Sequence, residues 1–350
     1  MDLIHPHGKG DVADALVEAT EDRRRILVVG GRRHMDKGNP CEVDAELWTT
    51  MLDRLVYYEP AEMIAVVEAG IRVGEFQRIL AEGGQEWPVD APEDATVGGV
   101  IAAAANSPRR LSVGAVRDTV LEIEFVTGHG RLLRSGARTV KNVSGYNMHR
   151  LLTGSLGTLG VIVQVAMKLR PLPAVRRTVR FSGGLDAAHA LLEAVPTCAA
   201  VLATMDIVEL RLEGWPEQVE TDARTATEVA EPIDASDEAP FPSQRPWENR
   251  PIVAEVAVPP SNLPEVLAVA GDAWGALAGV GLAWVGFDSP DGPLDALRAR
   301  ACAAGGIAPV VKGPGGLGAD APPALAIHQR LKAVFDPAGV FAPGRFWGGI

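Results

Sequence analysis

The most restrictive feature of this sequence is a stretch that has lost almost all of its side-chain volume. Residues 95–110 read ATVGGVIAAAANSPRR, with two adjacent glycines and four consecutive alanines behind Thr96. Thr96 is suited to cap a helix, and the alanines favour helix strongly enough to carry the glycines. Two explanations remain open: tight packing between two backbones, or a bulky planar ligand against a helix N-terminus with exposed N–H groups. The glycine pair favours the ligand, because each helical glycine costs about 1 kcal/mol relative to alanine.

Two further glycine-rich stretches point in the same direction. Residues 28–38 (VVGGRRHMDKG) follow an apolar strand, and successive glycines there can turn backbone N–H groups toward a phosphate. Residues 154–160 (GSLGTLG) offer a flat backbone strip to an aromatic ring system. Neither has the Gly-x-Gly-x-x-Gly spacing of a Rossmann turn, and no Walker pattern occurs. A nicotinamide dinucleotide or P-loop site is therefore unsupported.

Length and composition exclude several classes of protein. The 350 residues suffice for two domains, and the net charge of -12 argues against nucleic acid as a partner. Only three cysteines occur, far apart, which argues against an iron–sulfur or zinc site. We find neither a signal-peptide pattern nor an apolar run long enough to span a membrane. We expect a cytoplasmic protein without a metal site.

The hydrophobic pattern predicts an α+β protein. Before residue 173 we expect helices at 11–19, 74–82 and 147–153, strands at 26–31, 63–70 and 161–173, and a hairpin over 119–136. After residue 173 we expect strands at 175–181, 201–212, 252–258 and 281–287, and helices at 185–195, 263–277 and 294–303. Such alternation favours a small domain with helices on one face of an antiparallel sheet.

These patterns divide the chain into two domains. Residues 1–173 form the first, and the second begins at residue 174. Within the second, residues 231–251 are rich in proline and acidic residues, and we expect a flexible loop there.

Several motifs occur in the order seen in one family of flavoproteins. They are the GG turn after the first strand, TVGGVIAAAANSPRRLSVGAVRD, KNVSGYNMHRLLTGSLGTLGV and HQRLKAVFDPAGVFAPG. In this order the chain resembles FAD-linked oxidases of the vanillyl-alcohol oxidase/PCMH type, over residues 1–173 and the closing motif. Within that family it is most similar to FAD-binding subunits of bacterial glycolate oxidases. The resemblance implies a two-part PCMH-type FAD-binding domain over residues 1–173, completed by the tail over 325–350, and a reduced α+β cap domain over residues 174–324. It also implies FAD as cofactor.

The resemblance also implies which residues hold FAD. The loop over residues 30–34 would hold the pyrophosphate, the TVGG helix the flavin, and residues 157–162 the adenine side. The implied cofactor-binding residues are Gly30, Gly31, Arg32, Arg33, His34, Thr96, Val97, Gly98, Gly99, Ala102, Ala103, Ser107, Gly114, Arg117, Asp118, Gly157, Leu159, Gly160, Val161 and Ile162. His34 leaves open whether the flavin is covalently attached, since some family members use a histidine in that loop.

Two departures from the family bear on the chemistry. Relatives that oxidise 2-hydroxy acids alone carry a His-x-Gly-x-Gly-Asn-x-His metal loop, which this sequence lacks. Ala342 also stands where relatives usually have asparagine, so an amide near the flavin is lost. We cannot nominate a convincing base. Arg109, Arg110 and Lys141 are candidates to bind a substrate carboxylate, although the arginines can equally lie on a solvated face or a subunit contact.

The resemblance therefore implies a subunit of a glycolate oxidase-like complex that oxidises glycolate or D-lactate. A paralogous flavoprotein subunit would carry the metal loop, and an iron–sulfur subunit would accept the electrons, at the inner face of the membrane if the complex associates with it. Two alternatives remain open. One is a stand-alone, metal-free FAD-dependent alcohol or hydroxy-acid oxidoreductase, and the other is a non-catalytic flavin-binding scaffold.

Overall fold

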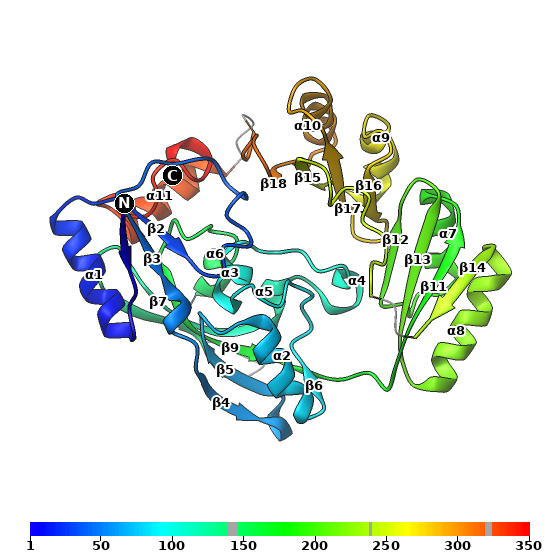
Figure 1. Cartoon of the computed structure of the whole chain (residues 1–350), viewed down its shortest axis with the longest axis horizontal. Helices are drawn as coiled ribbons and strands as arrows, with labels where there is room; N and C mark the ends of the chain where they lie inside the picture. The colour runs from blue at the N-terminus through cyan, green and yellow to red at the C-terminus, as the bar shows by residue number, and fades with distance from the viewer. Residues whose placement is uncertain (139–145, 238–239, 319–323) are drawn as a thin grey trace. The chain divides into compact units, whose positions relative to one another are not determined.

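The structure is a computed structural model that describes residues 1–138, 146–237, 240–318 and 324–350 (Figure 1). The chain forms two compact units. The first comprises Met1–Ser107, Ala115–Leu172 and Ala321–Ile350, and the second comprises Pro108–Gly114 and Pro173–Asp320. The short segment Pro108–Gly114, which follows the small-residue stretch, groups with the second unit although the sequence places it in the first domain.

The first unit contains two main sheets. Strands β1 (Asp2–Ile4), β3 (Ala45–Trp48) and β2 (Ile26–Val29) form a parallel sheet in that order. An antiparallel sheet has the order β4 (Leu55–Glu59), β5 (Ile64–Glu68), β9 (Val161–Lys168), β7 (Val120–Val126) and β8 (Leu132–Gly136). Strands β6 (Gln85–Glu86) and β10 (Arg170–Pro171) form a separate pair. The expected hairpin is confirmed as β7 and β8.

Helices cover these sheets with apolar faces. They are α1 (Lys9–Glu21), α2 (Val73–Glu82), α3 (Val97–Ala102), α5 (Val116–Thr119), α6 (Met148–Leu152) and α11 (Leu325–Phe335), with 3-10 helices η1 (Thr49–Met51), η2 (Pro60–Glu62) and η4 (Trp347–Gly349). Val12 and Leu16 of α1 pack with Ile26 of β2, while Phe76 of α2 packs against Trp87. The three helices expected in this unit are confirmed, each within a few residues.

Helix α3 begins as expected but ends early. Thr96 is its N-cap, and its side-chain oxygen accepts a hydrogen bond from Gly99 N–H. The helix closes after Ala102, because Ala104 takes a left-handed φ of 45° and its N–H bonds to Ile101 O at 3.0 Å. Ala105 N–H bonds back to Val100 O, also at 3.0 Å, which completes a Schellman motif. The alanines therefore end the helix rather than extend it.

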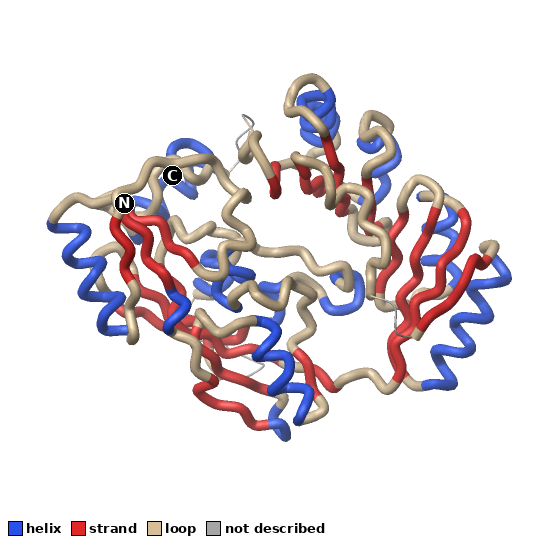
Figure 2. Tube along the Cα trace, viewed as in Figure 1, coloured by secondary structure: helices blue, strands red, loops and turns tan. Residues whose placement is uncertain are grey.

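The second unit is built on one antiparallel sheet of eight strands. Their order is β14 (Pro232–Ser236), β11 (Val175–Ser182), β13 (Ile207–Gly214), β12 (Ala200–Ala203), β16 (Trp274–Leu277), β17 (Leu282–Phe287), β15 (Ile252–Ala257) and β18 (Val310–Lys312). Its helices are α4 (Arg110–Val113), α7 (Leu185–Ala194), α8 (Pro216–Val229), α9 (Leu263–Leu267), α10 (Pro293–Ala303) and the 3-10 helix η3 (Pro260–Asn262). Helices α7 and α8 lie on one face of the sheet (Figure 2). The expected helices-on-sheet arrangement is confirmed.

Alternate residues of these strands serve two cores. Val201 and Ala203 of β12 face the core beneath the helices, whereas Leu202 between them joins a smaller cluster with Trp247. Trp247 stacks on Trp284 with ring centroids 5.7 Å apart. Because successive side chains of a strand point to opposite faces, both faces of the sheet are buried at β12.

Three expectations in this unit were wrong. The helix over 263–277 is the short α9 followed by strand β16, because Gly271 adopts a φ of 65° between them. The strand expected over 201–212 is instead the antiparallel pair β12 and β13, and helix α8 had not been expected. The segment 231–251 is not a loop throughout: it begins with β14, and its Trp247 is only 7% exposed. Ser243 and Gln244 also donate backbone N–H bonds to the buried carboxylate of Glu209.

Candidate functional site

The three glycine-rich stretches line one cavity in the first unit. The space there that protein atoms do not fill, its opening to solvent included, measures about 640 Å³. The expected residues that line it are Gly30, Gly31, Arg33, His34, Thr96, Gly98, Gly99, Ala102, Ala103, Gly157, Gly160 and Ile162. Sequence reasoning missed Val28, Met35, Thr49, Ala95, Leu156 and Arg345, which also line it. We call this space the flavin cavity, after the cofactor expected from the sequence.

Thr96 joins two walls of the flavin cavity. Its Oγ1 accepts hydrogen bonds from Gly99 N–H at 3.2 Å and from Gly31 N–H at 3.3 Å. The loop after β2 is therefore tied to the first turn of α3. A Cβ at Gly30 would lie 2.1 Å from the same oxygen, so a side chain there is incompatible with this cap.

The adjacent glycines Gly98 and Gly99 have different reasons to be glycine. A Cβ at Gly98 would lie 2.7 Å from Ala69 Cβ and 2.9 Å from Ala69 O, so close packing on the end of β5 excludes it. A Cβ at Gly99 would meet only Thr96 Oγ1, at 2.9 Å, and otherwise points into open space. Both explanations raised by the sequence therefore apply, one to each glycine. Gly99 leaves room in the flavin cavity for a ligand.

Arg345 places a buried cation in the wall of the flavin cavity. The residue is 6% exposed, and its Nη2 donates to the carbonyl oxygens of Met35 and Lys37, each at 2.9 Å. Burial lowers its pKa from the ordinary value, but an arginine stays protonated at neutral pH. In the sequence, Arg345 is marked only by its position directly after the Pro343-Gly344 pair of the C-terminal tail. A buried cation in the wall suits a phosphate-bearing ligand.

Arg33 lines the same cavity but is engaged elsewhere. Its guanidinium forms a two-pronged ion pair with Asp94, and both side chains are about half exposed. Arg32, next in the loop, has a left-handed φ of 58°, pairs with Glu46 at 2.5 Å and lies over the Trp48 ring. Of the two loop arginines, only Arg33 therefore contributes to the wall.

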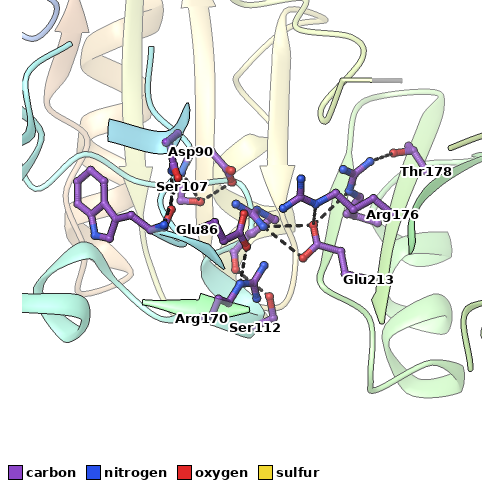
Figure 3. A network of polar contacts seen from close by, with 12 residues as sticks. Glu86, Asp90, Ser107, Ser112, Arg170, Arg176, Thr178 and Glu213 are labelled. Carbon is purple, nitrogen blue, oxygen red and sulfur yellow. Dashed lines mark hydrogen bonds and ion pairs between the residues drawn. The ribbon is translucent and has the colours of Figure 1, made fainter. Parts of the chain in front are cut away.

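Eight of the expected cofactor-binding residues are not part of this lining. They are Arg32, Val97, Ser107, Gly114, Arg117, Asp118, Leu159 and Val161. Val97 and Val161 are fully buried in the core, and Ser107 Oγ donates to Asp90 at 2.6 Å (Figure 3). Gly114 belongs to the second unit. Contact between these eight residues and a cofactor stays a prediction.

Two of the candidate carboxylate-binding residues, Arg109 and Arg110, do not line the flavin cavity. Arg109, only 6% exposed, bonds through Nη1 to both carboxylate oxygens of Glu213 at 3.2 Å. Arg176 and Arg211 share the same carboxylate, at 3.6 and 3.4 Å (Figure 3). Arg109 is therefore part of a structural ion cluster in the second unit. Arg110 begins α4, and Lys141 lies outside the described residues.

Three further observations concern Ala342, metal-ligand groups and membrane-spanning helices. Ala342 does not line the cavity. Its φ of 37° is left-handed, a conformation that asparagine adopts more readily than alanine, so the backbone gives a second reason for asparagine at this position in relatives. Within the described ranges we find no group of three or more His, Cys, Asp or Glu side chains that could hold a metal. None of the described helices combines the length and the apolar character needed to cross a bilayer.

Comparisons with known proteins agree with this geometry. Residues 3–136 match the family model of the FAD binding domain, and residues 318–346 match that of the C-terminal domain of FAD linked oxidases. The first match includes two of the three glycine-rich stretches, and the second includes Arg345. Both therefore cover parts of the flavin cavity.

The curated relatives are subunits and enzymes of hydroxy-acid oxidation. Glycolate oxidase subunit GlcE of Escherichia coli is 29% identical over 96% of this chain and 98% of its own length. Glycolate oxidase subunit GlcD of Bacillus subtilis is 26% identical over 59% of this chain, and D-lactate dehydrogenase of Archaeoglobus fulgidus is 32% identical over 48%. The chain spans less than half of the length of these last two, 45% and 38%.

Solved structures of alkyldihydroxyacetonephosphate synthase share the fold. Two of them superpose with TM-scores of 0.72 and 0.74 over 97% of this chain and 76% of theirs, at 15% identity. Together, these findings confirm the expected α+β fold of PCMH type, the cofactor FAD and the class of FAD-linked oxidoreductase.

Proposed function

We propose that the chain, which matches the family models of the FAD binding domain and of the C-terminal domain of FAD linked oxidases, is the FAD-binding subunit of a glycolate oxidase-like complex. The observation that carries this proposal is the match to GlcE over nearly the full length of both chains. Matches to the GlcD subunit and to the D-lactate dehydrogenases cover less than half of those proteins. The proposal assigns the first unit as the FAD-binding domain and the second as a reduced cap.

The residues of the flavin cavity fit FAD. The N–H groups of the loop after β2 and the guanidinium of Arg345 would hold the diphosphate, which is a dianion at neutral pH. Gly99 and the alanines after it would lie against the flavin, and Gly157 and Gly160 against the adenine side. Each charge-assisted hydrogen bond contributes about 1.5–3 kcal/mol, so a few suffice for micromolar affinity. When bound, FAD supplies a two-electron acceptor.

We propose that this chain acts on glycolate or D-lactate only together with partners. Hydroxy-acid oxidation needs a base near the hydroxyl and a cation for the carboxylate. Arg109 is held by Glu213, and the metal loop of self-sufficient relatives does not occur in the sequence. A paralogous flavoprotein subunit would therefore remove the hydride, and an iron–sulfur subunit would receive the electrons. The complex would lie in the cytoplasm or at the inner face of the membrane.

Anaerobic titration with glycolate and with D-lactate tests this proposal. Flavin absorbance is followed in the purified chain alone and in the chain reconstituted with the two partner subunits. We expect a yellow protein that stays oxidised alone and is reduced in the complex. Bleaching of the isolated chain by either acid would contradict the proposed division of labour and favour a stand-alone oxidoreductase.

A second arm distinguishes an active flavin from a scaffold. The complex is assembled with the Gly99→Val variant, whose added side chain would enter the flavin cavity. We expect assembly without electron transfer to the iron–sulfur subunit. Full activity of this complex would show that the chain serves as a scaffold.

A further inference from the structure

A second cavity lies in the first unit, on the other side of one wall of the flavin cavity. It measures about 200 Å³ and is bounded by α6, residues 153–159, α11 and the tail from Phe346. We call residues 154–160 the glycine strap. Leu156, Gly157 and Gly160 of the strap line the flavin cavity, whereas Ser155, Thr158 and Leu159 line the second cavity. The two spaces thus share the strap as a common wall.

Two polar atoms of this lining have no hydrogen-bond partner among the described residues. Ser155 is 6% exposed and its Oγ is unpartnered, and so is Nδ1 of the half-buried His328. A buried polar atom without a partner costs roughly 1–3 kcal/mol, so such atoms are rare unless they serve a ligand or an ordered water. Both residues line the cavity and come from different elements, the strap and α11.

The lining indicates the charge of the ligand. Arg150 contributes a guanidinium, and the described lining residues include no aspartate or glutamate. Arg150 pairs with Asp118 at 3.1 Å, yet its side chain remains 52% exposed and has further donors. A hydroxyl, an imidazole and a guanidinium together favour a ligand group that accepts hydrogen bonds and carries negative charge.

The remaining lining indicates the shape of the ligand. Leu331 and Phe346 supply apolar surface, and Phe346 packs against the His328 ring at a centroid distance of 5.5 Å. An apolar cavity of about 150 Å³ can accept benzene, so about 200 Å³ has room for one ring with a planar head group.

We propose that the second cavity binds a small monocarboxylate with a compact apolar body. Its carboxylate lies against Ser155, His328 and Arg150, and its body lies against Leu331 and Phe346. This site is separate from the flavin cavity, and the inference does not depend on the proposed role in a glycolate oxidase-like complex.

Calorimetric titration of the FAD-loaded full chain with sodium benzoate tests the proposal. We expect one saturable site per chain. Ser155→Ala and His328→Leu should each weaken binding about tenfold, because each removes one hydrogen bond to a charged group. Neither unpartnered atom holds another part of the described chain, so both variants should melt close to the wild type. Ser261→Ala, an exposed serine of the second unit, is the matched control and should bind benzoate normally.

Binding of benzamide tests whether the second cavity requires the negative charge of the ligand or only its shape. It has nearly the outline of benzoate but no charge, so we expect it to bind about tenfold more weakly to the wild type. Arg150→Gln should bring the two affinities together. No saturable benzoate binding, or binding that Ser155→Ala and His328→Leu leave unchanged, would overturn the site. Benzamide binding as tight as benzoate would overturn the assignment of a carboxylate.

Discussion

At the scale of single residues, the absence of a side chain has several physical causes within one stretch. Gly30 keeps clear of the Thr96 hydroxyl, Gly98 lets α3 pack on Ala69, and Gly99 borders the flavin cavity. Sequence reasoning could identify the stretch but could not separate these causes, because they depend on which neighbours the fold brings to each position. Each cause gives a different mutant phenotype.

Valine substitutions at the adjacent glycines should separate cofactor binding from folding. Gly99→Val should lose less stability than Gly98→Val, because its Cβ meets only the Thr96 hydroxyl, at 2.9 Å, and the rest of its side chain enters open space. Its affinity for FAD should fall at least 100-fold. Gly98→Val should lose about 1–3 kcal/mol or more of stability through overpacking against Ala69. Thermal melts of the apoproteins and fluorescence titration with FAD measure both effects, and normal FAD affinity in Gly99→Val would refute this account of the flavin cavity.

Arg345 should contribute more to FAD affinity than Arg33, although both line the flavin cavity. Arg345→Met removes a buried cation, so the Kd for FAD should rise about 10- to 100-fold, equivalent to roughly 1.5–3 kcal/mol. Arg33→Met is the matched control and should raise the Kd less, because its guanidinium is already paired with Asp94 and exposed. The prediction fails if equilibrium titration of the two variants gives equal Kd values.

At the scale of elements, the beginnings of the expected helices could be predicted better than their ends. The N-cap at Thr96 could be predicted, because a hydroxyl residue before a helical stretch is a strong local indication of a helix start. The end of α3 was not, because Ala104 occupies a left-handed position that glycine or asparagine normally fills. Helix α8 was missed because its buried face is narrow, with Val219 and Ala226 as its buried residues. Arg345 was missed because it reaches the cavity from the far end of the chain.

Helix α6 should make the stability of the first unit sensitive to mild acid. His149 is buried on this helix, and desolvation, assisted by Arg150, lowers its pKa below the ordinary value of 6.5. The unfolded chain therefore binds this proton more readily than the folded one. Stability should be unaffected above about pH 6.5 and should fall as the pH decreases below it. His149→Leu should flatten the pH dependence of the melting temperature over this range, and an unchanged slope would contradict the assignment.

At the scale of the whole molecule, the chain has two sets of cores, one in each compact unit. The clusters around Phe76 and Leu16 belong to the first unit, and those around Phe181 and Trp247 belong to the second. In the sequence, the change of pattern after residue 173 predicts a domain boundary there. It could not show that Pro108–Gly114 groups with the second unit, because that grouping depends on contacts distant in sequence.

Ligand binding and core mutation should therefore act on different parts of the unfolding profile. FAD at about 100 times its Kd should stabilise the first unit by about 2.7 kcal/mol, because the flavin cavity is lined entirely by residues of that unit. Trp247→Ala should destabilise the second unit by about 3–5 kcal/mol, because it empties a buried stack on Trp284. In differential scanning calorimetry, FAD should raise the transition of the first unit, and Trp247→Ala should lower that of the second. A single transition that both changes shift would show instead that the two units unfold as one cooperative system.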